Sequence, residues 1–198
     1  MIEFKNPCKE APYIILKEKY NEAADLRQEN IEAIAISSYN DQKKEVDSRF
    51  VNLKFIDDKE FIFFSNYNSP KSIAFNSHNQ IAALLYWPST NVQIRMKANI
   101  SKKSILFNQE YFKKRSIDKN ALAICSKQSE VTPSYNEIKT RYLEIKKSDD
   151  LLQCPDYWGG FSFTPYYFEF WEGHESRLNK REVYKKSDNS WVNCILQP

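Results

Sequence analysis

The chain has 198 residues, which is enough for one well-packed core and short for two, so we expect a single domain over residues 1–198. Hydrophobic residues make up 41% and charged residues 28%, as in a soluble globular protein. The net charge of +3 argues against a general nucleic-acid binder, which needs a concentrated basic face, but it allows a local basic pocket for a small anion.

The first half of the chain predicts one helix followed by an antiparallel meander of strands. Apolar residues that share one face predict a helix over residues 11–29, within an N-terminal helical segment of residues 1–30. Alternating or continuous apolar runs between turn signals predict strands. The expected strands are residues 31–38, 46–56, 60–66, 80–87 and 92–101, and a short helix is expected at residues 70–77. Residues 80–87 are nearly all apolar, so we expect that strand to be central.

The second half of the chain inserts helices before the strands return. Helices are expected over residues 105–115, 118–126 and 134–147, within an insertion of residues 105–148. The C-terminal strands, within residues 158–198, are expected at residues 160–164, 166–172, 182–187 and 190–196, with a hairpin turn at Asp188-Asn189. These elements predict a mainly β protein with inserted helices (α+β), folded as an antiparallel, Greek-key-like barrel.

Residue types that often build metal or redox sites are few and scattered. The two histidines, His78 and His174, are far apart, so we expect no metal site. The four cysteines lack the C-x-x-C spacing of a zinc site or a redox dithiol. Residues 1–10 hold no apolar signal segment, and no stretch approaches the roughly 20 apolar residues of a membrane span. We therefore expect a cytoplasmic protein with free thiols.

Polar clusters lie at the ends of several expected elements. With only three glycines, the chain has no glycine-rich phosphate loop, so a phosphate must be held by side chains or helix N-termini. The clusters are Arg49 with Lys54, Ser69–Lys71, Gln93, Tyr111 with Arg115, Lys127–Ser129, and residues 158–181. Most of them, taken alone, are explained at least as well by a solvated surface. Together they suit two phosphates and a flat ring.

Spacing gives three of these clusters a definite geometry. Arg49 and Lys54 are five residues apart and so lie on opposite faces of a regular strand, where they reach different anions or are both surface charges. Tyr111 and Arg115 are one helical turn apart, where they clamp a phosphate or pack as a surface pair. The pair Gly159-Gly160 indicates a bulge or a backbone that needs room.

In this order, the clusters resemble the pyridoxamine 5′-phosphate oxidase family, which are FMN enzymes with a split-barrel fold. The similarity runs from about residue 20 to Pro198, and its most specific stretches are residues 60–71, 80–88, 126–129 and 158–181. The resemblance implies an FMN-binding split β-barrel that oxidises pyridoxamine or pyridoxine 5′-phosphate to pyridoxal 5′-phosphate with molecular oxygen and releases hydrogen peroxide. It also implies a homodimer with each flavin in the subunit interface.

The resemblance assigns a role to each matching position. The expected FMN-binding residues are Arg49, Phe64, Ser65, Lys71, Gln93, Gln128, Ser129, Trp171 and Arg181. The expected residues for the phosphorylated pyridine substrate are Lys54, Tyr111, Arg115, Lys119 and Arg177. Arg177 would lie against the pyridine ring, and Arg177 and Asn179 are the expected catalytic residues.

Four positions depart from the family pattern. Asn179 and Lys180 replace a histidine and an acidic residue, Lys119 replaces a serine, and Pro70 replaces an arginine. Asparagine does not titrate, so the departure at residue 179 removes a group that carries charge or a proton. These positions keep three alternatives open: a split-barrel oxidase for a phenazine-type aromatic substrate, a flavin-binding dimer without turnover, and a barrel without a cofactor.

Overall fold

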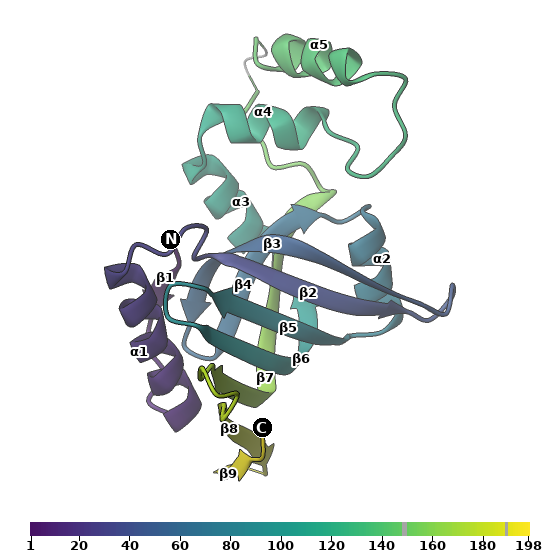
Figure 1. The fold of residues 1–198 in the computed structure, drawn as a ribbon. Helices are drawn as coiled ribbons and strands as arrows, with labels where there is room; N and C mark the ends of the chain where they lie inside the picture. Colours follow the sequence, from purple (N-terminus) through teal and green to yellow (C-terminus); the bar gives the residue numbers. More distant parts are fainter. Residues whose placement is uncertain (148–149, 189) are drawn as a thin grey trace.

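The computed structural model describes residues 1–147, 150–188 and 190–198, and this part of the chain contains nine strands and five helices (Figure 1). The helices are α1 (Ala11–Asp25), α2 (Pro70–Ser77), α3 (Ile105–Lys114), α4 (Ile117–Cys125) and α5 (Tyr135–Ile145). The strands are β1 (Glu3–Lys5), β2 (Ala33–Asn40), β3 (Glu45–Asp57), β4 (Glu60–Asn66), β5 (Gln80–Trp87), β6 (Val92–Lys102), β7 (Trp158–Glu172), β8 (Lys180–Ser187) and β9 (Ser190–Leu196).

Six of the strands close into a barrel. The order β3–β2–β5–β6–β7 is completed by β4, which pairs with both β7 and β3. Every pairing in this ring is antiparallel, whereas β1 joins β3 in parallel outside the ring. β8 and β9 extend from the far part of β7. The predicted antiparallel barrel and the central place of β5 are confirmed.

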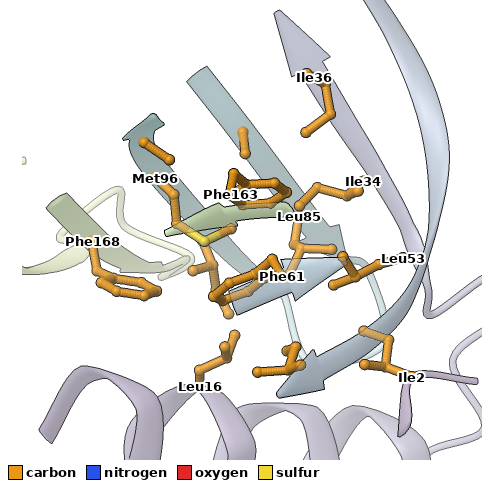
Figure 2. Packing of buried hydrophobic residues seen from close by; sticks show 14 of the residues in the cluster. Ile2, Leu16, Ile34, Ile36, Leu53, Phe61, Leu85, Met96, Phe163 and Phe168 are labelled. Atoms are coloured by element: carbon orange, nitrogen blue, oxygen red, sulfur yellow. The ribbon is translucent and has the colours of Figure 1, made fainter. Parts of the chain in front are cut away.

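Alternating side chains of the barrel strands fill its interior. In β6, Val92, Ile94, Met96 and Ala98 are buried, while the residues between them are at least partly exposed, as the alternation predicts. Figure 2 shows Phe61, Phe163 and Leu85 pointing into this core, with Leu16 of α1 packed against it from outside the sheet. Burying one such phenylalanine contributes roughly 1.5–3 kcal/mol. The barrel is therefore a rigid support for side chains at its edges.

Several element boundaries differ from the sequence-based expectation. The helix expected over residues 11–29 ends at Asp25, because Arg27 takes a left-handed conformation (φ 56°) and its N–H donates to the Ala24 carbonyl. The strands expected on either side of Pro165 form one strand, β7. Tyr166 is the extra residue of a bulge opposite Lys97 and Ala98, so the pairing becomes irregular directly after the proline without ending the strand.

The smaller differences lie at chain ends and turns. β1 was not expected from the sequence, since three residues are too few for a recognisable alternation. The expected helix over residues 134–147 is α5, which begins after Ser134 and ends at Ile145. Residue 148 of the expected insertion and Asn189 of the expected hairpin turn lie outside the described residues. β8 and β9 do pair as an antiparallel hairpin, with Ser187 opposite Ser190.

The inserted helices lie beyond one end of the barrel, whereas β8 and β9 lie beyond the other (Figure 1). β7 connects the two regions, since it begins near α3 and ends beside β8. Among the described helices, none is both long enough and apolar enough to cross a membrane.

Candidate functional site

A cavity of about 610 Å³ lies where β3, β4 and the start of β7 meet α2, α3 and α4. Its volume is in the range of ligand-binding pockets. It is lined by most of the residues singled out from the sequence. These are Arg49, Lys54, Phe64, Ser65, Lys71, Tyr111, Arg115, Lys119, Gln128 and Ser129. Residues as distant in the chain as Arg49 and Ser129, which are 80 positions apart, thus share one cavity.

Arg49 and Lys54 line the same cavity, although their spacing along a regular strand would place them on opposite faces. The pairing of β3 with β4 shifts between Leu53 and Phe55, which makes Lys54 the extra residue of a bulge. A bulge resets the alternation of side chains between the two faces. Leu53 and Ile56, three residues apart, consequently both belong to the core.

Arg49 and Lys71 form a cationic pair at the cavity wall. Arg49 donates hydrogen bonds to the Ile36 carbonyl (3.1 Å) and to Ser38 Oγ (2.8 Å) and also pairs with Asp47. Lys71 is buried on the first turn of α2, where Nζ donates to Ser65 Oγ at 3.1 Å. Burial lowers the pKa of the Lys71 ammonium to about 8, and the nearby positive charge of Arg49 adds to the shift. An anion at this wall relieves both effects.

The segment between α4 and α5 is fastened to this wall through Gln128. Its Oε1 accepts hydrogen bonds from Ser65 Oγ and from the backbone N–H of Asn66, both at 3.2 Å. The neighbouring Ser129 takes a left-handed conformation, with φ at 70°. Gln128 is therefore held against β4, and both Gln128 and Ser129 line the cavity.

A second group of cations stands beside a stack of parallel rings. Tyr111 lies on Phe64 with ring centroids 3.8 Å apart and planes inclined by 10°. Trp158 is parallel to Phe64 at 5.2 Å, and the Arg115 guanidinium lies 4.3 Å from the centroid of Trp158. Arg115 also donates to Asn120 Oδ1 at 3.2 Å. Tyr111 and Arg115 both line the cavity, but Arg115 is the extended residue that follows the last residue of α3, Lys114, so the two do not share a face of that helix.

Among the described residues, none of the cations of this second group forms a salt bridge with an acidic side chain. Within the described part of the chain, the side chains of Lys54 and Lys119 form no hydrogen bond or ion pair. Burial lowers the pKa of Arg115, while it raises the pKa of the Tyr111 phenol. We call Lys54, Tyr111, Arg115 and Lys119 the Arg115 group, and Arg49 with Lys71 the Arg49 pair. Both are suited to bind anionic groups.

Sequence reasoning gave no site role to Asp47, Phe50, Val51, Asn52 and Trp158, which also line the cavity. Trp158 stands directly before Gly159-Gly160, and the requirement for room at this point was visible in the sequence. A Cβ at Gly159 would lie 2.3 Å from Asn108 Nδ2, so α3 can approach β7 only because residue 159 is glycine. Asn108 Oδ1 accepts the Gly160 N–H at 2.8 Å, and this contact fixes the strand that carries Trp158.

The other predicted site residues lie at the opposite end of β7. Gln93, Trp171 and Arg181 are consecutive partners across β6, β7 and β8. Trp171 is 13 residues from Trp158, which corresponds to roughly 40 Å along an extended strand. Arg177 and Asn179 lie in the loop between β7 and β8. We call these five residues the far group, and one chain does not bring them into the cavity.

The far group is built around a buried carboxylate. Glu169 accepts hydrogen bonds from Arg181 Nε and Nη2 (2.9 and 2.8 Å), from Arg95 (2.9 Å) and from Tyr167 (2.9 Å). Burial alone raises the pKa of Glu169, but these hydrogen bonds and the arginine charges bring it below its usual range. Arg181 is thus held in a fixed position on the sheet.

The loop that carries Arg177 is closed by a side chain. Asn179 Oδ1 accepts the backbone N–H of His174 at 3.0 Å, and the Arg177 N–H donates to the His174 carbonyl at 2.9 Å. Arg177 itself is left-handed (φ 61°) and exposed. In the described ranges its side chain has no hydrogen-bond or salt-bridge partner. In those ranges, no group of three or more metal-binding side chains comes together either.

The sequence is similar to pyridoxine 5′-phosphate oxidases both in its C-terminal region and over nearly its whole length. Residues 158–198 match the family described as the pyridoxine 5′-phosphate oxidase C-terminal dimerisation region. The chain is also similar to a pyridoxine/pyridoxamine 5′-phosphate oxidase from Rhodopirellula baltica. The two are 31% identical over 201 residues, which cover 98% of this chain and 90% of the relative.

Two solved structures share the fold. PhzG from Burkholderia lata, in complex with tetrahydrophenazine-1-carboxylic acid, matches with a TM-score of 0.90 and 25% identity, covering 98% of this chain and 95% of that one. A pyridoxamine 5′-phosphate oxidase-related, FMN-binding protein from Nostoc punctiforme matches with a TM-score of 0.79 and 11% identity, covering 96% and 99%. The barrel is thus a split barrel of this type, as predicted.

Proposed function

Because the chain belongs to the pyridoxine/pyridoxamine 5′-phosphate oxidase family, we propose that it is an FMN-dependent oxidase that converts pyridoxamine or pyridoxine 5′-phosphate to pyridoxal 5′-phosphate. The observation that carries this proposal is the single cavity that is lined by both the Arg49 pair and the Arg115 group, together with the parallel rings of Phe64, Tyr111 and Trp158. Two separate cationic groups suit two phosphorylated molecules bound together, one at each group.

The Arg49 pair fits the phosphate of FMN. A buried lysine beside an arginine is unfavourable without an anion, and a phosphate dianion supplies the missing charge. Ser65 and Gln128 add hydrogen-bonding groups at the same wall. When bound, FMN supplies the two-electron acceptor, which molecular oxygen then reoxidises.

The Arg115 group would bind the substrate. Lys54, Arg115 and Lys119 offer positive charge for its phosphate, and the Tyr111 hydroxyl adds a donor. Trp158 and Asn120 hold Arg115 in one orientation before substrate arrives. This preorganisation reduces the ordering cost of binding and places the pyridine ring reproducibly for reaction.

We propose that the far group completes the cavity of a second copy of the chain. Gln93, Trp171 and Arg181 share one row of the sheet, near the end of β7, whereas Trp158, at the start of β7, lines the cavity of the same chain. The match of residues 158–198 to a dimerisation region supports a homodimer. In such a dimer, Arg177 of the partner subunit would lie against the substrate ring, and Arg181 of the partner subunit would contact FMN.

The proposal is tested by adding FMN and pyridoxamine 5′-phosphate to the purified protein under air. We expect pyridoxal 5′-phosphate and hydrogen peroxide in equal amounts. Arg115→Ala is the control, since it should raise the KM for the phosphorylated substrate while FMN remains bound. Flavin-loaded protein that yields neither product would contradict the proposed reaction.

A second candidate is oxidation of a larger carboxylated aromatic ring. It is favoured by the similarity to PhzG and by Lys119, which also lines a hollow of about 380 Å³ between α4 and α5. Leu122, Tyr135, Ile138 and Tyr142 give that hollow an apolar wall next to the cavity. Anaerobic bleaching of the flavin by a dihydroaromatic carboxylate, but not by pyridoxamine 5′-phosphate, would favour this candidate.

A further inference from the structure

Asp47 is an acidic residue in an otherwise basic cavity. Among the described residues that line the cavity, it is the only carboxylate. It lies on β3, two residues before Arg49, and its carboxylate forms an ion pair with Nη2 of that arginine. The Asp47 side chain is 69% exposed, whereas that of Arg49 is 18% exposed. The acid is therefore the member of the pair that can move away easily.

Arg49, in contrast, is anchored. Its Nη1 is occupied by the Ile36 carbonyl at 3.1 Å and by Ser38 Oγ at 2.8 Å, which fixes the guanidinium on β2. The Nη2 atom is the one that Asp47 takes. Any anion that binds Arg49 at Nη2 must displace Asp47 from that nitrogen or share it.

Asp47 also acts on the second cation of the pair. The charge of Arg49 lowers the pKa of Lys71, whereas the charge of Asp47 opposes this shift. Asp47 thus neutralises part of the repulsion between Arg49 and Lys71. A bound phosphate would do the same, so the carboxylate and the phosphate serve one pair of cations. The Arg115 group has no such acid among its lining residues in the described chain.

We propose that Asp47 is an internal counter-anion that competes with the phosphate of FMN and sets the cofactor affinity. This inference rests on the flavin part of the proposed function and is independent of the substrate. Asp47 stabilises the empty cavity, and binding of the cofactor phosphate requires its carboxylate to leave Arg49. The chain therefore holds FMN less tightly than its two cations alone would allow.

The test is the dissociation constant of FMN for the apoprotein, measured by quenching of flavin fluorescence at pH 7. Asp47→Asn keeps the shape of the side chain and removes its charge. We expect the dissociation constant to fall by about tenfold at low salt, and the gain to shrink as added salt screens the charge. Glu45→Gln is the matched control, since it removes an exposed acid from the same strand that does not line this cavity.

A double-mutant cycle identifies the route of the effect. Asp47→Asn lowers the logarithm of the FMN dissociation constant by a certain amount in the otherwise native protein. In an Arg49→Gln background, we expect the same substitution to lower it by less than half of that amount. An unchanged or raised dissociation constant in Asp47→Asn overturns the proposal, as does an equal gain in Glu45→Gln. The FMN titration contains no substrate, so its result does not depend on the proposed reaction. If Asp47→Asn binds FMN more tightly but the flavin-loaded protein does not turn over pyridoxamine 5′-phosphate, the proposed reaction is contradicted and this inference is supported.

Discussion

The buried side chain of Lys71 gives the cavity a preference for anions. Its ammonium is buried between the hydroxyls of Ser65 and Ser69, with Nζ at 3.1 and 3.2 Å from their oxygens, and Arg49 is close enough to repel it. Hydroxyls satisfy its N–H groups but do not neutralise its charge. A dianion does, so ligand binding and protonation of Lys71 favour each other.

This linkage predicts a pH dependence of FMN binding. The pKa of Lys71 lies near 8 without ligand, and a phosphate beside it raises that pKa. Below about pH 8 the lysine is already charged and affinity should be constant; above it, a proton must be taken up and affinity should fall. Fluorescence titrations between pH 7 and 9.5 measure this FMN affinity. In Lys71→Met, the affinity should not change with pH in this range, and FMN binding should be weaker by roughly 1.5–3 kcal/mol. A wild-type affinity that does not change over this range would contradict the assignment.

At the scale of elements, much of the fold and part of the site could be predicted from the sequence. Strong periodicity places β2, β5, β6 and α2 within about two residues of their bounds. Spacing placed Tyr111 and Arg115 close together, and the family resemblance placed both in the site, where they line the cavity. The position of Lys54 on the cavity wall could not be predicted from strand spacing, because the bulge depends on how β3 pairs with β4 and leaves no local signal in the sequence. Asp47 was missed because its contact with Arg49 matters only once the cavity is formed.

The loop between β7 and β8 gives a prediction at this scale. Asn179 was expected to be catalytic from its place in the family pattern, but its side-chain oxygen already accepts the His174 N–H. We infer that Asn179 positions Arg177 by closing the loop. Asn179→Ala should lower kcat about tenfold, because the loop loses roughly one hydrogen bond that keeps it preorganised. FMN affinity and melting temperature should change little.

Two readouts separate positioning from proton transfer at residue 179. Asn179→Asp keeps an acceptor oxygen and should recover most of the lost turnover, with the pH profile of kcat unchanged in shape. Hydrogen exchange of the His174 amide should be faster in Asn179→Ala. An amide that stays protected in this variant would show that the loop does not depend on Asn179, whatever the reaction turns out to be.

At the scale of the whole molecule, β7 separates the cavity residues from the far group, although the family pattern assigns both to one site. The strand begins at Trp158, in the cavity, and ends at Glu172, beside Arg181 and Arg177. A single closed barrel is too rigid to fold these ends onto each other, since its core of buried aromatic and aliphatic side chains fixes the strand. In the proposed dimer, two chains related by a twofold axis would solve this geometry, because each would supply its far group to the cavity of the other.

Subunit complementation tests that arrangement directly. Arg115→Ala damages the cavity and Arg177→Ala damages the far group, so each variant alone should have little activity. If the two groups meet across a dimer, a mixed dimer contains one site with both defects and one with neither. Random reassembly of equal amounts makes about half of the dimers mixed, so about 25% of wild-type activity should return. If refolding the variants together restores no more activity than either has alone, while mixed dimers are detected by a tag, each site must draw both arginines from one chain.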